Sequence, residues 1–150
     1  MHYRARLALA GTTLALANLT GSPLLGDEAI RLHLESIQLM PHSWALWNRL
    51  ASAYVQLDRH QQALEATGRS LAITEQTKHS ASAYCIRGTA LRGLGRLEES
   101  VMSLTRCLEL NDAGVSAIEA HKALSGVYAE LEESDLAERH LRLAQQIAAP

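Results

Sequence analysis

The chain has 150 residues, a formal net charge of -2 and charged side chains at 20% of its positions. With so small a net charge, no global field draws it to nucleic acid or to a lipid surface, and no stretch of the sequence is long and apolar enough to span a membrane. The length fits one domain, in which eight helices of about 13 to 16 residues would use nearly every position.

The first twenty residues allow two interpretations. A basic start followed by an apolar stretch is similar to a secretory signal. However, Ala17 and Thr20 precede Ala51 and Tyr54 by 34 residues, so the same segment fits the first helix of a repeated unit. We favour the repeat and a cytoplasmic location, because removal of this segment would leave the next helix without a partner. Export, with residues 1–17 acting as a signal peptide, is the alternative.

Breakers and caps divide the next part of the chain into helices. Residues 21–23, Gly-Ser-Pro, end the first helix. Asp27 is the predicted N-cap of the second, because its carboxylate can accept from the free amides of the first turn. Pro41 ends that helix, and Ser43 can cap the third. The fourth helix is expected from residue 61 to about residue 77.

The clearest helical pair lies at residues 84–111. Two apolar stripes of helical period are separated by the breaker Gly95, and Gly88 and Ser100 are small residues where the helices would approach closely. A large side chain of one helix can then enter the groove beside a small one of the other. The segment therefore predicts a helix-turn-helix hairpin. A final helix is expected at about residues 134–148.

This hairpin pattern recurs along the chain. The position of Tyr84 recurs 37 residues earlier at Trp47 and 37 residues later at His121, and a further step of 34 back from Trp47 reaches Thr13. Two of the units therefore have three more residues than the first. We expect the excess around residues 78–80 to form an extra turn or a longer loop.

With these motifs the chain resembles the tetratricopeptide repeat family, whose 34-residue unit begins aromatic-x2-Leu-Gly-x2-Tyr. The best match is Trp47-x2-Leu50-Ala51-x2-Tyr54. The resemblance implies an all-α fold, a right-handed α-solenoid of four helix-turn-helix repeats with about eight antiparallel helices in a single domain. The repeats are predicted at residues 10–43, 44–80, 81–117 and 118–150.

The residues that could carry chemistry form no recognisable catalytic or metal motif. Cys85 and Cys107 lie in one hairpin, and we interpret them as buried free thiols, with a disulfide as the alternative in a secreted chain. The histidines lack the spacing of a helical metal site, so we predict no metal, no cofactor and no enzymatic activity. They are His2, His33, His42, His60, His79, His121 and His140.

In the resembling family, the first helix of each hairpin lines a concave groove that binds peptides or partner helices. The resemblance therefore implies a protein-protein interaction scaffold with a protein or peptide ligand. We expect Asn48, Arg49 and Arg92 to hold an extended peptide through its backbone and acidic side chains. The candidate peptide-binding residues are Asn18, Asn48, Arg49, Ser52, Gln56, Thr89, Arg92 and Lys122.

The end of the array indicates an alternative function. Leu136, Leu141, Leu143 and Ile147 lie in the final helix, and no ninth helix follows in the sequence to cover them. Repeat arrays usually end in a helix with a polar outer face. We therefore keep a homo-oligomer, assembled through the C-terminal helix, as the alternative. Nucleic acid is not an expected partner, because aromatic residues are not interleaved with the arginines of the third repeat.

Overall fold

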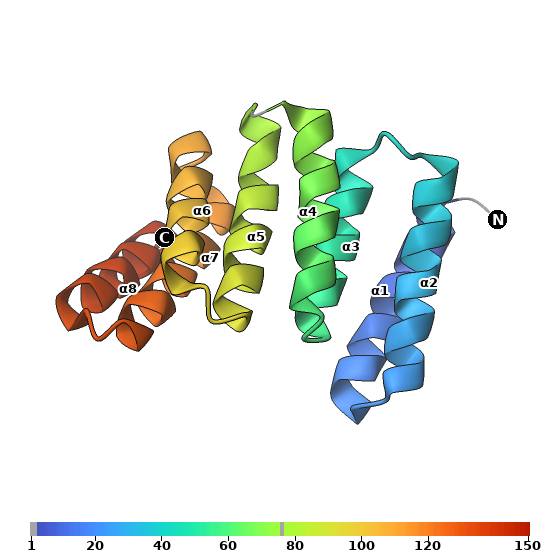
Figure 1. Ribbon diagram of the computed structural model, residues 1–150, viewed down its shortest axis with the longest axis horizontal. Coiled ribbons are helices and arrows are strands. Elements are labelled where there is room, and N and C mark those ends of the chain that lie inside the picture. The colour runs from blue at the N-terminus through green and yellow to red at the C-terminus, as the bar shows by residue number, and fades with distance from the viewer. Residues whose placement is uncertain (1–2, 76) are drawn as a thin grey trace. The chain divides into compact units, whose positions relative to one another are not determined.

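The computed structural model of the protein describes residues 3–75 and 77–150, which fold into eight α-helices and one short 3-10 helix (Figure 1). No β-strand occurs among these residues, so the predicted all-α fold is confirmed. The chain forms two compact units, Met1–Ile73 and Thr74–Pro150. Its division into four repeats within a single domain stays a prediction.

Unit 1 consists of two helical hairpins. They are formed by α1 (Tyr3–Thr20), α2 (Pro23–Leu39), α3 (Trp44–Gln56) and α4 (His60–Thr74). α1 packs along α2, and α2 packs on α3. Ala10, Leu14 and Ala17 are buried on the inner side of α1. The first helix is therefore part of the packed unit, as the repeat interpretation predicts.

α2 begins earlier than predicted. Pro23 lies in its first turn, and Ser22 is the N-cap, whose Oγ accepts a hydrogen bond from the backbone N of Leu25 at 3.5 Å. Proline suits this position because the first turn does not use its missing N–H and its φ is already helical. Asp27, the predicted N-cap, instead lies inside the helix, where its carboxylate forms an ion pair with Arg59.

Unit 2 consists of two further hairpins. They are formed by η1 (Lys78–Ser80), α5 (Ala81–Gly93), α6 (Leu97–Leu110), α7 (Gly114–Glu130) and α8 (Ser134–Ala148). The 3-10 helix η1 is the extra turn that the sequence predicts. The core between the hairpins is made by Leu104, Leu124 and Val127, which are almost completely buried.

α5 and α6 approach each other closely at Gly88, which has no side chain. A Cβ atom at Gly88 would lie 2.5 Å from Cγ of Leu104, which is far closer than a van der Waals contact. Ser100 Oγ donates a hydrogen bond of 2.7 Å to the carbonyl oxygen of Gly88. The close approach predicted for these two positions is therefore confirmed, and Ser100 satisfies its buried hydroxyl within the contact.

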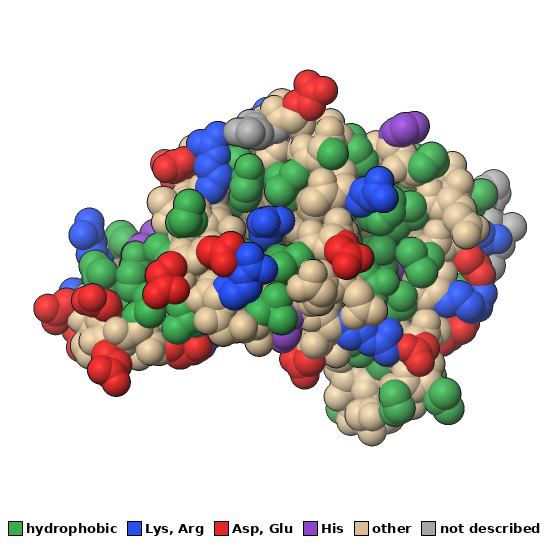
Figure 2. Space-filling view, in the orientation of Figure 1, with side chains coloured by type: hydrophobic (Ala, Val, Ile, Leu, Met, Phe, Trp, Pro, Cys, Tyr) green, Lys and Arg blue, Asp and Glu red, His purple; other side chains and the backbone are tan. Residues whose placement is uncertain are grey.

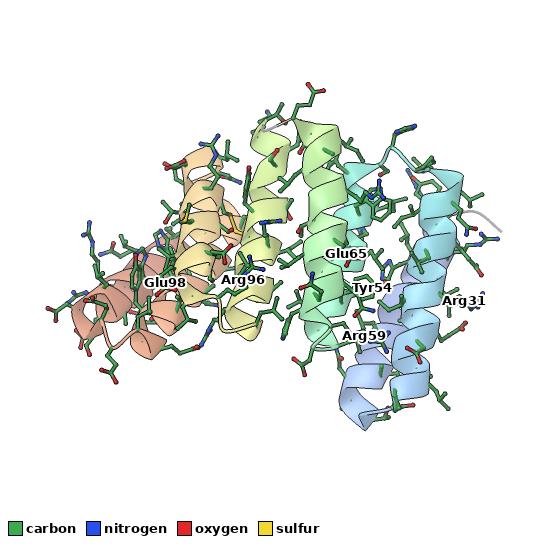
Figure 3. The ribbon with its side chains drawn as sticks, viewed as in Figure 1. Arg31, Tyr54, Arg59, Glu65, Arg96 and Glu98 are labelled. Atoms are coloured by element: carbon green, nitrogen blue, oxygen red, sulfur yellow. A yellow bond between two sulfur atoms is a disulfide. The ribbon has the colours of Figure 1, made fainter. Side chains whose placement is uncertain are left out.

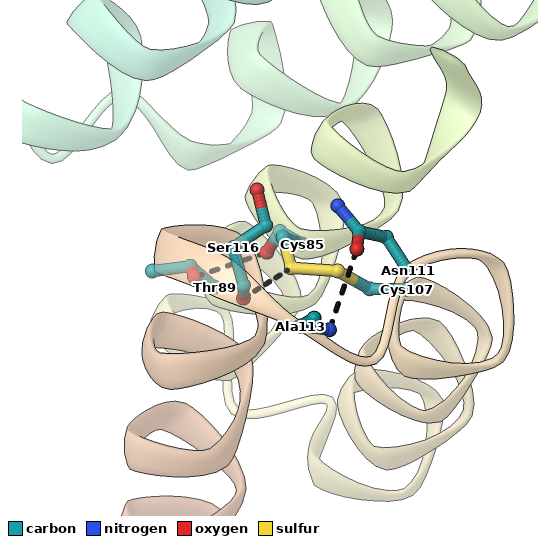
Figure 4. The surroundings of a disulfide bond; sticks show 6 residues. All are labelled: Cys85, Thr89, Cys107, Asn111, Ala113 and Ser116. Atoms are coloured by element: carbon teal, nitrogen blue, oxygen red, sulfur yellow. Dashed lines mark hydrogen bonds between the residues drawn. A yellow bond between two sulfur atoms is a disulfide. The ribbon is translucent and has the colours of Figure 1, made fainter. Parts of the chain in front are cut away.

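The interpretation of the cysteines as free thiols is wrong. Cys85 of α5 and Cys107 of α6 form a disulfide with an S–S distance of 2.02 Å (Figure 4). The hairpin places their Cα atoms 5.3 Å apart, within the range that a disulfide can bridge. Cys107 is fully buried, whereas Cys85 is partly exposed and its Sγ lies 3.5 Å from the carbonyl oxygen of Ser116 in α7. The sequence could not show this pairing, because it depends on which faces of two helices meet.

α8 covers the end of unit 2 better than the sequence predicts. Leu136, Leu143 and Ile147 are half-buried and Ala144 is buried, so the apolar stripe faces inward. Leu141 alone among the leucines of this helix is clearly exposed, at 46%. The remaining outward positions include Glu138, Arg139, Arg142, Gln145 and Gln146. Self-association through this helix stays a prediction, with little apolar surface to support it.

Two histidines meet between α7 and α8. Nδ1 of His121 lies 2.8 Å from Nδ1 of His140, and the ring of His140 stacks on Tyr128 with ring centres 5.4 Å apart. One Nδ1 donates and the other accepts, so at least one ring is neutral. Burial lowers the pKa of both histidines, and the positive charges of His121 and Arg139 lower the pKa of His140 further.

Loss of the disulfide should destabilise the protein. Cys85→Ala combined with Cys107→Ala opens a loop that spans a sequence separation of 22 residues. The unfolded chain then gains entropy, which predicts a decrease of about 3 kcal/mol in the free energy of unfolding. Urea denaturation measures this decrease. As a control, a reducing agent should destabilise the wild type and leave the double variant unchanged; equal stability of the oxidised and reduced wild type would contradict the bond.

Mild acid should destabilise the protein through the histidine pair. In the unfolded chain both imidazoles titrate near pH 6.5, whereas their pKa values are lower in the fold. The unfolded state therefore binds protons first, so we expect the pair's contribution to be complete above about pH 7 and to be lost as the pH falls through the folded pKa values.

Urea denaturation at several pH values tests this contribution. His140→Gln should make the stability less sensitive to acid, whereas His42→Gln, at an exposed position between α2 and α3, should not. The same pH dependence in His140→Gln and the wild type would rule the pair out.

Candidate functional site

Three of the predicted peptide-binding residues form one hydrogen-bonded chain in unit 1. Asn18 Nδ2 in the last turn of α1 donates to Oε1 of Gln56, the last residue of α3, at 3.0 Å. Gln56 Nε2 donates in turn to Ser52 Oγ at 3.4 Å, one helical turn earlier. Helical spacing and the resemblance to the tetratricopeptide repeat together predicted these residues, and the structure brings them together across two hairpins.

Asn48 extends this row by one further turn of α3. It is only 6% exposed, and neither its Nδ2 nor its Oδ1 has a hydrogen-bond partner among the residues that the structure describes. An unsatisfied buried polar group costs about 1 to 3 kcal/mol. We call Asn18, Asn48, Ser52 and Gln56 the amide stripe. Asn18, Ser52 and Gln56 are joined by hydrogen bonds. The amide group of Asn48 makes no hydrogen bond to the described residues.

Arg49 lies at the edge of the amide stripe. Consecutive helical residues point about 100° apart, so it cannot share the direction of Asn48. Its side chain is exposed, and no carboxylate in the described parts of the chain lies within ion-pair distance of it. Burial lowers the pKa of His33 in α2, and the positive charge of Arg49 lowers it further. Arg49 thus carries a charge that nothing nearby neutralises.

The predicted donors of unit 2 already have partners. Arg92 Nε donates to Oε1 of Glu130 at 2.6 Å, and its guanidinium occupies the space where Gly126 lacks a Cβ. Lys122 Nζ lies 3.3 Å from Oε1 of Glu119, and the Thr89 hydroxyl donates to the carbonyl oxygen of Cys85. Arg92, Lys122 and Thr89 thus already have hydrogen-bond or ion-pair partners, whereas Asn48 of the amide stripe has none among the described residues.

Unit 1 also has a shallow hollow that the sequence did not predict. It measures about 570 Å³ and is lined by residues of α3 and α4 and by one residue of α2. Leu34, Trp47 and Tyr54 form its apolar wall, and Glu65 and Arg69 supply opposite charges. Figure 3 labels Tyr54 and Glu65, two of the residues that line the hollow. Burial raises the pKa of the Tyr54 phenol. Small residues in α4 were the only signal in the sequence, and they also fit ordinary helix packing.

Metal and membrane sites gain no support from the described part of the chain. Residues 3–75 and 77–150 contain no group of three or more histidine, cysteine or carboxylate side chains placed so that they could hold a metal ion. His2 lies outside these residues. Across the same ranges, every helix is too short or too polar to traverse a bilayer.

Similarity to known proteins identifies the fold. Residues 42–113 match a sequence model of the tetratricopeptide repeat, and no curated protein sequence matches the chain significantly. The structure resembles TTC0263, a thermophilic TPR protein of Thermus thermophilus, with a TM-score of 0.78 and 23% identity over 97% of this chain and 74% of that one.

Two other solved structures support the same fold. MamA from Desulfovibrio magneticus RS-1 has a TM-score of 0.69 and 19% identity over 93% of this chain and 73% of that one. The first TPR domain of human RPAP3 has a TM-score of 0.63 and 25% identity over 86% of this chain and 97% of that one.

The predicted α-solenoid is confirmed by these likenesses. The matching family is in general a non-enzymatic scaffold for contacts between proteins. Residues 42–113 are therefore similar to tetratricopeptide repeats, and the described chain has the fold of tetratricopeptide repeat proteins.

Proposed function

We propose that this protein is an interaction scaffold that binds an extended segment of a partner protein along the amide stripe. The observation that carries the proposal is the buried carboxamide of Asn48, which has no hydrogen-bond partner among the described residues. In the free protein this amide is a cost to stability. Both polar atoms are buried, so a ligand reaches them only after the side chains that cover Asn48 move. A ligand that then bonds both atoms removes that cost.

The chemistry of the stripe matches a peptide backbone. A carboxamide offers a donor and an acceptor side by side, as a peptide group does, and the two can pair in both directions. An extended peptide leaves its own N–H and C=O groups free for such pairing. Ser52 and Gln56 lie at successive turns of α3, so they offer further hydrogen bonds along the same line.

Charge gives the proposed ligand a second property. Arg49 stands beside Asn48 without a neighbouring carboxylate in the described residues, whereas Arg92 and Lys122 are paired with Glu130 and Glu119. A guanidinium binds a carboxylate through two parallel hydrogen bonds. We therefore expect a ligand with an acidic side chain next to the peptide group that pairs with Asn48.

The disulfide bears on where this scaffold works. We propose an oxidising compartment in place of the cytoplasmic location, with α1 kept as part of the folded chain, because structural disulfides persist there and are rare in the cytosol. The bond between Cys85 and the fully buried Cys107 supports this choice. Alkylation of the unfolded chain from its native cells should find no free thiol; two free thiols would favour the cytosol.

A binding assay with a selected peptide tests the amide stripe. Random dodecapeptides are selected by phage display on the wild type, and the best is labelled for fluorescence anisotropy. Asn48→Leu should raise its Kd about tenfold or more, because each lost buried hydrogen bond costs about 1 to 3 kcal/mol. The same substitution should leave the free energy of unfolding unchanged or higher, since it replaces an unsatisfied amide by an apolar side chain with the same number and branching of heavy atoms.

Two further variants complete this test. Gln146→Ala, at an exposed amide of α8, should leave the Kd unchanged. Arg49→Glu should weaken binding of an acidic peptide more at low salt than at high salt. If Asn48→Leu keeps full affinity, or loses affinity only together with stability, the peptide does not use the amide stripe.

A further inference from the structure

The outer side of α1 is apolar from Ala5 to Leu19, although it faces solvent. Its exposed leucines are Leu9 at 45%, Leu16 at 47% and Leu19 at 84%. Thr12 and Ala15, which lie between these leucines, and Ala5 and Ala8, which precede them, are also exposed. Figure 2 shows hydrophobic side chains also at the turn between α1 and α2, where Leu24 is 79% exposed. An exposed apolar row of this extent marks an interaction surface.

These residues share one face of the helix. They recur at positions 5, 8, 12, 15 and 19, with Leu9 and Leu16 next to them, which is the seven-residue period of a helix that packs against another helix. The inner face, with Ala10, Leu14 and Ala17, is already buried in unit 1. We call the outer row the α1 stripe; it consists of Ala5, Ala8, Leu9, Thr12, Ala15, Leu16 and Leu19.

The polar groups of the stripe do not need water. Thr12 Oγ1 donates to the carbonyl oxygen of Leu9 at 2.9 Å, so its hydroxyl is satisfied within its own helix. Thr20, at the end of the helix, does the same with Leu16 at 2.7 Å. From Leu7 to Thr20 the helix carries no charged side chain. A partner can therefore cover the stripe without burying a charge or an unpaired hydroxyl.

We propose that the α1 stripe binds the α1 stripe of a second copy of this chain, in an antiparallel pair with two-fold symmetry. The order of large and small residues carries this proposal. When Thr12 meets its own counterpart at the two-fold axis, Leu16 of one copy faces Ala8 of the other, and Leu19 faces Ala5. Leu9 faces Ala15 in the same register. Each leucine thus meets an alanine, so large side chains fill the spaces beside small ones.

Charge agrees with the antiparallel direction. In this register Arg4 of one copy lies beside Thr20 of the other, at the C-terminal end of its α1. The free carbonyl groups there carry the negative end of the helix dipole, which attracts a cation. A parallel pair would instead bring the two Arg4 side chains together. The exposed Gly11, beside Thr12, has open space where a Cβ would stand, which lets the two helices approach closely near the axis.

Light scattering on the full chain tests the pair. We expect the mass of the wild type to rise toward twice the single-chain mass of 16.4 kDa as the concentration increases from about 1 to 100 µM. Leu16→Glu should give the single-chain mass with unchanged helicity by circular dichroism. The matched control is Leu141→Glu on α8, whose leucine is 46% exposed against 47% for Leu16; it should stay dimeric.

Cross-linking tests the register. A bis-maleimide should join two copies of the Thr12→Cys variant, because this residue meets itself at the axis, while the native cysteines are held in their disulfide. Two copies of Leu19→Cys should not be joined, since their positions lie about 21 Å apart along an antiparallel pair. A wild type that is monomeric throughout, a dimer broken by Leu141→Glu but not by Leu16→Glu, or efficient cross-linking through Leu19→Cys would each overturn the proposal.

Discussion

The fold depends on close contact between helices at positions that carry almost no side chain. Ala51, Ala63, Ala90 and Ala120 are completely buried, and Gly88 leaves room for Leu104. Such short side chains bring little apolar area, so each hairpin gains stability only when a neighbour adds its own large residues to the same contact. A single hairpin would bury too little apolar area to remain folded. The periodic alternation of small and large residues therefore fixes both the unit and the need for its repetition.

The same periodicity explains what the sequence could predict and what it could not. Helices and their pairing follow from spacing within a short window. Spacing on α3 places three residues of the amide stripe in one row, whereas Asn18 joins them from α1. The first residue of a helix is harder to predict, because several neighbouring residues can act as the N-cap. α2 begins at Pro23 with Ser22 as its N-cap, and not at Asp27, because proline fits the first turn without strain. The disulfide depends on a contact between two helices. The ion pair of Arg92 with Glu130 likewise depends on a contact between two helices, and the predicted role of Arg92 in peptide binding stays a prediction.

Polar residues divide into two groups according to whether the fold satisfies them. Ser100 and Thr12 bond backbone carbonyl groups of their own hairpin or helix, so they stabilise the fold and offer a ligand little. Asn48 differs from them, because its amide group loses its hydrogen bonds to water on burial and gains none from the described residues. Residues that lower stability without serving packing are expected where binding selects them. The distinction makes Asn48 a stronger candidate than more exposed polar positions, whose groups water satisfies in the free protein.

The first and the last helix of the described chain differ in what they leave exposed. α8 directs Leu136, Leu143 and Ile147 inward and presents charges and amides to solvent. α1 is apolar on both of its sides, so unit 1 can bury only one of them. A helix with two apolar sides is stable in water when two partners cover it. Since α2 provides the first, the second has to come from another surface, and the matched order of leucine and alanine makes an identical helix the simplest one to fit.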